Sequence, residues 1–351
     1  MKKLLLVFAS FLFVFALAAC NGTEEEATLE EFNSYFQIGL VTDTGGIDDK
    51  SFNQGTWEGV ELFAETLMLP ESAYRYVQSS SDADYIPNIS AFSDEKLDLI
   101  VMPGFLFEDA LIESAANYPA QKYLIIDMVV DAPNVASAVF AENEGSFLVG
   151  VAAALKAQEA GEDTVGFIGG MDFDLIQKFE AGFEAGVWAV DPTMTVLVDY
   201  AESFSDAAAG QALAVKQYGE GAYIIFHAAG GTGNGVINEA KSRRANDEDV
   251  WVIGVDKDQY EDGIYEGEMS AVLTSMMKRV DVAAYDVAVA TYKGEFPGGE
   301  ILVFDLSNDG VGLPLVNPNL SQAIVDQVAT YKAGLLAGTY TAPTVPSRLD
   351  E

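Results

Sequence analysis

Short apolar runs rich in β-branched residues alternate with longer segments of helical periodicity along most of the chain after residue 36. This alternation is typical of repeated strand–helix–strand units. Several of the apolar runs are continuous, which indicates strands buried on both faces and therefore parallel sheets covered by helices. The pattern predicts strands at 37–43, 74–79, 98–104, 122–128, 135–142, 164–170, 193–201, 222–230, 250–256, 270–275 and 300–306, and helices that include 53–67, 144–160, 175–190 and 280–294.

Many of the predicted strands end in Asp, Gly or an aromatic residue. Ligands of open α/β sheets bind outside the carboxyl ends of the strands, so this series of strand ends predicts a cleft. The roughly 315 residues after residue 35 exceed what one compact core usually supports, and we therefore expect two lobes.

The order of elements predicts how the two lobes share the chain. The first lobe is expected to contain residues 36–140 plus about 270–297, and the second lobe residues 141–269 plus about 305–340. Residues 341–351 would form a C-terminal tail. The chain would then cross between the lobes three times.

The N-terminal region predicts the compartment. Two lysines precede an unbroken apolar run that ends in small residues, which is the layout of a signal peptide at 1–19. The run is too short to favour a permanent transmembrane helix. The Leu-Ala-Ala-Cys sequence that ends at Cys20 resembles the bacterial lipobox, whose cysteine is acylated; the alternative is a buried cysteine in an uncleaved anchor. Cys20 is the only cysteine, so no intrachain disulfide forms, and the acidic segment 20–35 predicts a solvated tether.

The charge balance excludes several ligand classes. With 55 acidic and 18 basic residues, the chain has a formal net charge of -37. Such a surface repels nucleic acid and anionic lipid headgroups, so we expect no nucleic-acid partner. A nucleotide needs a basic pocket for its phosphates, and the sequence has neither a Lys/Arg cluster nor a Walker loop.

The first candidate site is the stretch DTGGIDDKSFNQG, residues 43–55. It follows a predicted strand, and an acidic residue such as Asp49 can cap a helix that starts near Phe52. Phe52 and Asn53 would then project toward the carboxyl edge of the sheet, beside Asp43. A planar heterocycle needs an aromatic face and hydrogen bonds to its edge, so Phe52 is a candidate platform for a base. The alternative is a hydrophobic staple at the helix start.

The second candidate is IIFHAAGGTGNG, residues 224–235. Its glycines do not match the spacing of a dinucleotide fingerprint, and close backbone approach to a small polar ligand is the better interpretation, with Gly231 as the candidate contact. Phe226 either faces this ligand or belongs to the core, and His227 is most simply a strand-end residue. One histidine and no second cysteine leave little for a zinc or nucleophile mechanism.

The third candidate is a set of charges at strand ends. Asp256 and Asp258 follow one predicted strand, Lys278 follows the next, and Asp127 follows four apolar residues. Carboxylates suit the hydroxyls of ribose or a sugar, and a lysine can donate to a ring or hydroxyl oxygen. Two carboxylates also serve glycosidic hydrolysis, so a hydrolase is the rival interpretation. The third interpretation is that these residues are solvated charges in loops.

In this order, the segments resemble the basic membrane protein family, the nucleoside-binding lipoproteins of bacterial ABC transporters. The resemblance implies a type I periplasmic-binding fold, in which two Rossmann-like α/β lobes with parallel sheets, joined by three crossover segments, close on a purine or pyrimidine nucleoside. The match covers nearly all of 37–336, and its pieces are 43–55, 140–155, 165–187, 226–240, 252–260 and 272–283.

The resemblance also implies roles for individual residues. The base stack corresponds to Phe52 and Phe226, the base-edge partners to Asp43, Asn53 and Asp127, and the ribose contacts to Gly231, Asp256 and Lys278; Asp49 completes the expected ligand set. The chain departs from the family pattern at Asp174, where relatives often carry proline.

These observations lead to one expected function. The protein would be lipid-anchored through Cys20 at the extracytoplasmic face of a bacterial cell membrane. It would capture a nucleoside, with purine nucleosides favoured, and would deliver it to an ABC permease and its ATPase subunits. We expect a monomer, with no cofactor, no metal and no reaction on the ligand. The alternatives are a sugar or other small-solute receptor, a sensor, and a nucleoside hydrolase that uses Asp256 and Asp43.

Overall fold

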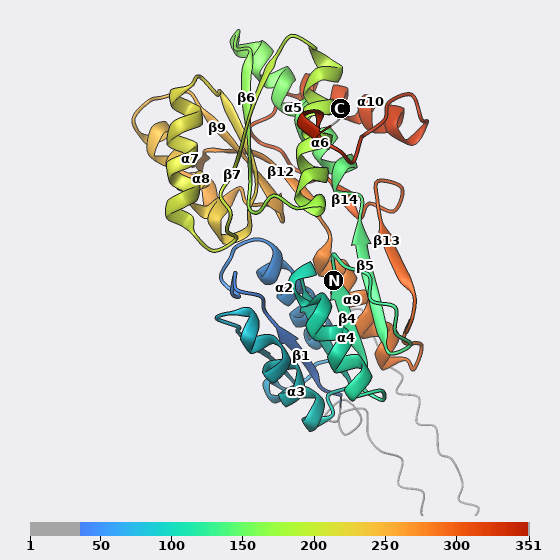
Figure 1. The fold of residues 1–351 in the computed structure, drawn as a ribbon. Helices are drawn as coiled ribbons and strands as arrows, with labels where there is room; N and C mark the ends of the chain where they lie inside the picture. The colour runs from blue at the N-terminus through green and yellow to red at the C-terminus, as the bar shows by residue number, and fades with distance from the viewer. Residues whose placement is uncertain (1–35, 350–351) are drawn as a thin grey trace, which may run out of the picture.

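The computed structural model, which describes residues 36–349, contains two α/β lobes (Figure 1). The first lobe holds the strands β1 (Ile38–Val41), β2 (Tyr74–Val77), β3 (Leu99–Pro103), β4 (Tyr123–Ile126), β5 (Val135–Phe140) and β13 (Ile301–Phe304). The second holds β6 (Thr164–Gly169), β7 (Thr195–Tyr200), β8 (Ile224–Ala228), β9 (Trp251–Asp256), β12 (Val272–Lys278) and β14 (Val311–Gly312). A separate antiparallel pair consists of β10 (Ile264–Glu266) and β11 (Met269–Ser270).

Each lobe is built on one six-stranded sheet. The strand order is β13-β5-β4-β3-β1-β2 in the first lobe and β14-β12-β9-β8-β6-β7 in the second. All neighbouring strands in these two sheets are parallel except β12 and β14. The two-lobed, parallel α/β fold expected from the continuous apolar runs is therefore confirmed.

Helices cover both faces of each sheet (Figure 1). In the first lobe, α2 (Phe52–Thr66) and α9 (Val280–Tyr292) pack on one face, and α3 (Tyr85–Glu95) and α4 (Glu108–Asn117) on the other. In the second lobe, α5 (Glu142–Ala160) and α6 (Asp174–Val190) lie opposite α7 (Ala207–Gly219) and α8 (Gly233–Ala245), and α10 (Gln322–Leu336) packs against α5. The described residues also include six 3₁₀ turns: η1 (Glu71–Ala73), η2 (Asp82–Asp84), η3 (Phe105–Phe107), η4 (Gly230–Thr232), η5 (Glu261–Gly263) and η6 (Ser347–Leu349).

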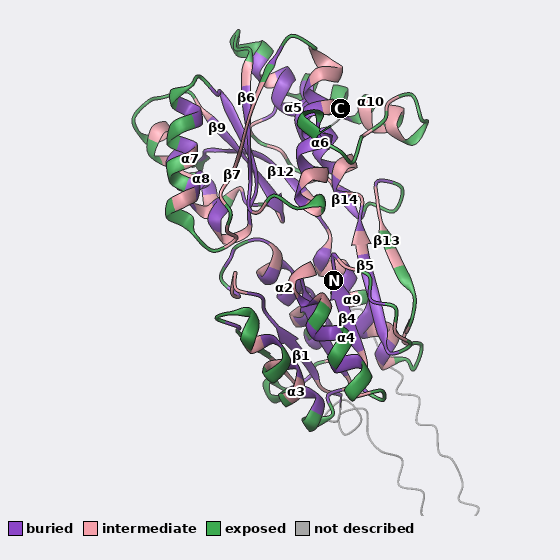
Figure 2. Ribbon diagram, in the orientation of Figure 1, coloured by how far each residue is buried: buried purple, intermediate pink, exposed green. Residues whose placement is uncertain are grey.

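The core explains the continuous apolar runs. Every residue of β1, β3, β4, β8 and β9 is buried (Figure 2), because helices remove both faces of these strands from water. The contact between α5 and α6 is close because glycines stand where the backbones meet. A β-carbon at Gly150 would lie 2.3 Å from the carbonyl oxygen of Phe183, and one at Gly186 would lie 2.0 Å from that of Phe147. This contact fixes α6, which forms one wall of the site described below.

The second crossing between the lobes differs from the predicted one. We expected residues from about 270 to 297 to belong to the first lobe, but β12 pairs with β9 in the second sheet, so this expectation is wrong for residues 272–278. The chain returns to the first lobe only at Arg279, after which α9 packs on α2. The sequence did not reveal this, because a continuous apolar run suits either of two parallel sheets.

Some predictions fall outside the described residues. The signal peptide at 1–19, the acylated Cys20 and the tether at 20–35 all precede residue 36. Among residues 36–349, the helices are all too short or too polar to cross a lipid bilayer.

Candidate functional site

A cavity lies between the two lobes, at the carboxyl ends of strands from both sheets. This is the position at which open α/β sheets bind their ligands. The first lobe contributes Asp43, Gly45, Asp49, Phe52, Asn53, Gly104, Phe105 and Asp127 to its walls, and the second contributes Leu175, Ile176, Phe179, Phe204, Ala228, Ala229, Gly230, Val255, Asp256 and Lys278. The structure thus brings together seven of the nine residues expected to bind ligand: Asp43, Asp49, Phe52, Asn53, Asp127, Asp256 and Lys278.

Asp49 caps the helix that carries the aromatic platform. Its carboxylate accepts hydrogen bonds from the backbone N–H groups of Ser51 at 3.0 Å, Asn53 at 2.8 Å and Gln54 at 3.1 Å. Ser51, the residue directly before α2, makes no side-chain cap hydrogen bond. Burial raises the pKa of Asp49 to about 6, although these hydrogen bonds act to lower it. Asp49 therefore holds the start of α2 in place beneath the cavity.

Asn53 links Asp49 to Asp43. Its amide nitrogen donates to Asp43 Oδ1 at 2.8 Å and to Asp49 Oδ2 at 3.0 Å, so both amide hydrogens are engaged. Asn53 Oδ1 is buried and has no hydrogen-bond partner among the described residues. Burial raises the pKa of Asp43, while donation from Asn53 and from the backbone of Gly45 opposes this shift. This corner of the cavity therefore presents hydrogen-bond acceptors to a ligand.

Phe52 opens α2 and lines the cavity next to this acceptor corner. Gly104 lies beside its ring with a φ of +120°, and a β-carbon there would come within 3.7 Å of Phe52 Cε1. A glycine at this position leaves room beside the ring and meets the backbone requirement. The ring also contacts the core, so the staple interpretation describes part of its role.

The second lobe contributes two aromatic residues to the cavity wall, Phe179 and Phe204. Phe226, expected there from the sequence, lies in the core of the lobe with an exposed fraction of 0%, and its ring stands 5.7 Å from Phe167 and 6.4 Å from Phe179. The choice of Phe226 as a cavity residue is therefore wrong. Phe226 lies in a fully buried strand and Phe179 on the amphipathic helix α6, and the packing of α6 on the sheet decides that the ring of Phe179 reaches the cavity.

Lys278 is the buried cation of the site. Its exposed fraction is 2%, and its ammonium pairs with Asp127 at 2.5 Å and with Glu142 at 3.5 Å. The same nitrogen lies 5.0 Å from the centre of the Phe52 ring and 5.5 Å from that of Phe179. Lys278 thus joins acids of both lobes and lies near the rings of Phe52 and Phe179, which face the cavity from opposite lobes.

Glu142 was missed by the sequence reasoning. It opens α5 at the first crossing, its exposed fraction is 0%, and it also pairs with Lys178 at 3.5 Å. Burial raises the pKa of Glu142, although Lys278 acts to lower it. From the sequence, an acid at the start of a helix is interpreted as an exposed charge that complements the helix dipole. Its position at a crossing between the lobes was the available signal that it would be buried.

Carboxylates outnumber cations in and around the cavity. Burial raises the pKa of Asp256 to about 6, with Lys278 and Ser51 opposing it. Burial alone would lower the pKa of Lys278, but the charges of Asp127, Glu142 and Asp256 outweigh burial and raise it. A closed site of this kind favours a ligand that donates hydrogen bonds over one that brings negative charge.

Two of these acids have a strained backbone conformation. Asp127 has a φ of +69° and Asp256 has a φ of +66°, and each lies at the carboxyl end of a central strand, one in each lobe. Left-handed backbone at residues other than glycine is uncommon and clusters at functional sites. The equivalent geometry in the two lobes aims one carboxylate from each side at the space between them.

The lobes are closed over the cavity. Ser51 Oγ donates to Asp256 Oδ2 across the gap, and Phe105 of the first lobe contacts Phe173 and Phe204 of the second at ring distances of 5.3 and 6.2 Å. Further links between the lobes are Asn234 Nδ2 to Asp49 O at 3.1 Å, Gln259 Nε2 to Lys50 O at 2.9 Å, Lys50 to Asp262 at 3.0 Å, and Lys257 to Glu58. These polar links border the site and leave its centre to a ligand.

Two residues of the glycine-rich segment lie beside the cavity and not on its wall. A β-carbon at Gly231 would lie 3.2 Å from the carbonyl oxygen of Phe204 and 3.8 Å from Cβ of Asp49, so this glycine permits the lobes to approach each other. His227 is fully buried against Gly233, and burial lowers the pKa of His227 to about 4. The neighbouring Gly230, with a φ of +53°, is the glycine that lines the cavity.

Within residues 36–349, no cluster of His, Cys, Asp and Glu has the arrangement needed to hold a metal ion. The cavity is equipped for recognition, with aromatic rings and acceptor carboxylates from both lobes and one ammonium.

The chain is similar to known transport proteins over nearly its whole length. A family model described as ABC transporter substrate-binding protein PnrA-like matches residues 36–337. A CD4+ T-cell-stimulating antigen of Listeria innocua is 40% identical over 341 residues, which cover 94% of this chain and 95% of the relative. An ABC transporter nucleoside-binding protein BmpA of Lactococcus lactis is 39% identical over 340 residues, with 94% and 95% covered.

Solved structures agree with this relationship. An ABC transporter solute-binding protein of Aeropyrum pernix superposes with a TM-score of 0.77 at 26% identity, covering 88% of this chain and 94% of that one. A solute-binding protein of Conexibacter woesei, with a TM-score of 0.67 at 19% identity and coverage of 88% and 99%, shares the fold. The expected family is confirmed, and the hydrolase interpretation is excluded. The chain belongs to the PnrA-like family of ABC transporter substrate-binding proteins, which bind a solute and are not enzymes.

Proposed function

We propose that this protein captures nucleosides, with purine nucleosides preferred, in the cavity between its lobes and delivers them to an ABC import permease. The observation that carries the proposal is the pair of rings, Phe52 from one lobe and Phe179 from the other, that line a cavity rich in carboxylates and lie 5.0 and 5.5 Å from the Lys278 ammonium. A base offers a flat π-surface to such rings, and the larger purine offers more of it.

The polar groups suit the rest of a nucleoside. Ribose hydroxyls each donate a hydrogen bond, and Asp256 and Asp127 approach the cavity from opposite lobes as acceptors. Lys278 is a donor in reach of a ring or hydroxyl oxygen. The acceptor corner formed by Asp43 and Asn53 Oδ1 suits N–H groups on the edge of a base.

The same charges argue for a nucleoside over a nucleotide. Five buried acids surround or adjoin the cavity, against one fully buried lysine: Asp43, Asp49, Asp127, Glu142 and Asp256. A phosphate would add negative charge to this site, where the pKa values of Asp43, Asp49 and Asp256 are already raised. We therefore expect nucleoside monophosphates to bind far more weakly than nucleosides.

Closure is the proposed mechanism of capture. The contacts of Asp256 with Ser51 and of Phe105 with Phe173 exist only when the lobes meet. A ligand that touches both lobes shifts the population toward this closed form, which a permease can distinguish from the open one. We propose that acylation of Cys20 anchors the protein at the extracytoplasmic face of the membrane, where it acts as a monomer.

Isothermal titration calorimetry tests the ligand. Protein that begins at residue 36 would be titrated with adenosine, guanosine, inosine, cytidine and uridine, and with ribose and galactose in parallel. We expect heat and a raised melting temperature with nucleosides, since a ligand that binds only the native state stabilises it. Absence of binding to every nucleoside would refute the proposal. Binding of the sugars alone would support the sugar-receptor alternative.

Delivery and anchoring need separate measurements. Uptake of labelled nucleoside by cells that lack this protein, with and without a wild-type copy, distinguishes import from sensing. Metabolic labelling with a fatty acid, compared between the wild type and Cys20→Ser, tests the anchor. Loss of label with retained nucleoside binding by the purified variant is the expected result.

A further inference from the structure

The wall of the cavity in the second lobe is held by residues from the C-terminal segment, which was expected to be a tail. Leu175, Ile176 and Phe179 form this wall at the start of α6, and the loop before α6 carries Phe173, which contacts Phe105 across the gap. The position of this loop therefore affects both the shape of the cavity and the aromatic contact that joins the two lobes beside it.

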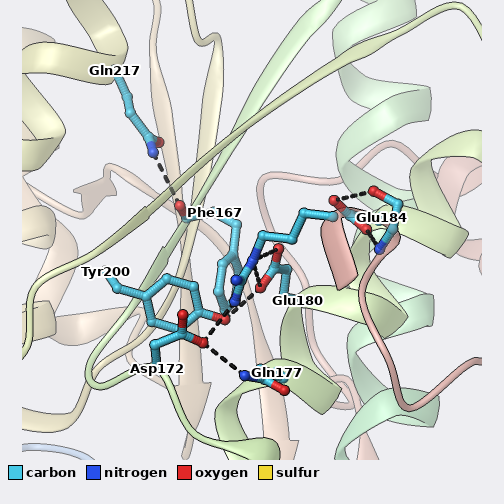
Figure 3. A network of polar contacts seen from close by, with 9 residues as sticks. Phe167, Asp172, Gln177, Glu180, Glu184, Tyr200 and Gln217 are labelled. Carbon is cyan, nitrogen blue, oxygen red and sulfur yellow. Dashed lines mark hydrogen bonds and ion pairs between the residues drawn. The ribbon is translucent and has the colours of Figure 1, made fainter. Parts of the chain in front are cut away.

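The start of α6 lacks a cap of its own. Phe173 is the residue before the helix, and it makes no side-chain cap hydrogen bond. The loop is tied down by Asp172, whose carboxylate accepts from Gln177 Nε2 at 2.8 Å and from the guanidinium of Arg348 at 2.7 Å (Figure 3 shows Asp172 and Gln177). One of the two ties thus comes from a residue 176 positions further along the chain.

Arg348 also neutralises a buried acid on the same helix. Its Nε donates to both carboxylate oxygens of Glu180, at 2.9 and 3.2 Å, and the exposed fraction of Glu180 is 0%. The hydroxyl of Tyr200 donates to Glu180 as well, and the guanidinium lies 5.0 Å from the centre of the Tyr200 ring. A carboxylate in this position needs a partner, since an unpaired buried charge strongly destabilises a fold.

A second buried acid, one turn later on α6, also takes its hydrogen-bond partners from the C-terminal segment. Glu184 is buried with an exposed fraction of 4%, and it accepts from the backbone N–H of Ser347 at 2.8 Å and from its hydroxyl at 3.1 Å. Glu180 and Glu184 therefore form a row along α6 whose partners are consecutive residues of η6 (Figure 3). The neighbouring Asn143 donates to the carbonyl of Ala342 at 2.6 Å, which extends the attachment along the segment.

We propose that the segment 342–349 is a strap that positions the nucleoside cavity, and that Arg348 is its positioning residue. By joining Asp172 of the loop to Glu180 of α6, Arg348 fixes the loop relative to the helix that carries Phe179. No residue of the strap lines the cavity, and the effect of the strap on affinity rests on the proposed function of the cavity. The expected effect of the strap on the loop does not depend on that function.

The experiment compares Arg348→Gln with the wild type in the full chain. Affinity and dissociation rate would be measured with guanosine and adenosine, and amide hydrogen exchange would be measured for residues 170–179. We expect affinity to fall about 3- to 30-fold, mainly through faster dissociation, with faster exchange in 170–179 and unchanged exchange in α2. Arg348→Lys, which keeps the charge, should recover part of the affinity.

Two further variants separate positioning from general stability. Glu180→Gln combined with Arg348→Gln removes the buried charge together with its partner, so it should restore most of the melting temperature while affinity stays low. Lys332→Ala breaks an exposed pair with Asp309 elsewhere in the C-terminal region and should change neither measurement. A lowered melting temperature with affinity within about twofold and unchanged exchange in 170–179 would overturn the strap. If the wild type bound no nucleoside, the proposed function would fail, and the exchange of 170–179 in Arg348→Gln would decide the strap alone.

Discussion

Replacement of Lys278 by methionine is the most direct test of how the site is held together. Methionine is unbranched and only one atom shorter than lysine, so it keeps most of the bulk of the side chain and removes the ammonium that lies near the rings of Phe52 and Phe179. The change is therefore mainly electrostatic. It leaves Asp127 and Glu142 buried with side-chain exposures of 4% and 0%. Removal of one partner of a buried ion pair costs about 3–5 kcal/mol, and we expect the free energy of unfolding to fall by this amount at pH 7.5.

The pH dependence gives the prediction its sign. In Lys278→Met, loss of the cation removes the charge that lowers the pKa of buried Glu142, so in the folded state this pKa rises further above its ordinary value of 4.5. The folded variant then binds more protons than the unfolded chain, so its stability increases as pH falls. One carboxyl that stays protonated between pH 7.5 and 5 recovers up to about 3 kcal/mol of the loss.

Chemical denaturation followed by tryptophan fluorescence provides the assay, because Trp57 reports on the first lobe and Trp188 and Trp251 report on the second. Asp127→Asn combined with Lys278→Met serves as the control and should be more stable than Lys278→Met alone. A loss below about 1 kcal/mol, or a loss equal at both pH values, would refute the view that Lys278 neutralises these acids.

Three further predictions follow from the site. Phe52→Ala should weaken nucleoside binding by about 1–3 kcal/mol in calorimetry, the scale of base stacking, while Leu62→Ala on the exposed face of the same helix leaves it unchanged; a collapse of the melting temperature in Phe52→Ala would favour the staple instead. Asp49→Ala should destabilise the protein by about 1–2 kcal/mol in denaturation, since three backbone donors lose their cap, and equal stability would contradict that role. Burial raises the pKa of Asp256 to about 6 from an unfolded value of 3.8, so the stability that this carboxyl contributes is present below pH 3.8 and is lost as pH rises through 6. Asp256→Asn should therefore flatten the decline in melting temperature between pH 4 and 7. An unchanged slope would count against this role of Asp256.

Much of the site was available from the sequence because strand ends and polar residues coincide. Asp43, Asp127, Asp256 and Lys278 each follow an apolar run, and parallel strands of one sheet end at one edge. That rule places these residues at the cavity without any knowledge of which strands are neighbours. Phe52 and Asn53 follow from the same logic, since the helix after β1 starts at that edge.

Other residues could not be placed by this reasoning. Glu142 and Arg348 look like ordinary surface charges in the sequence, and only the tertiary structure buries the first beside Lys278 and docks the second against Glu180. Their partners are 136 residues away for Glu142 and Lys278 and 168 for Arg348 and Glu180, and no local pattern encodes contacts at such separations.

The sequence by itself therefore determined the α/β class, the edge at which ligand would bind and most of the polar groups there, because hydrophobic periodicity and strand ends are local properties. The tertiary structure decided that β12 joins the second sheet, and that Phe179, and not Phe226, faces the cavity. The physical reason is common to both. A strand or helix that is apolar on all sides can bury any face, and the choice among faces and sheets is made by packing against elements distant in the chain.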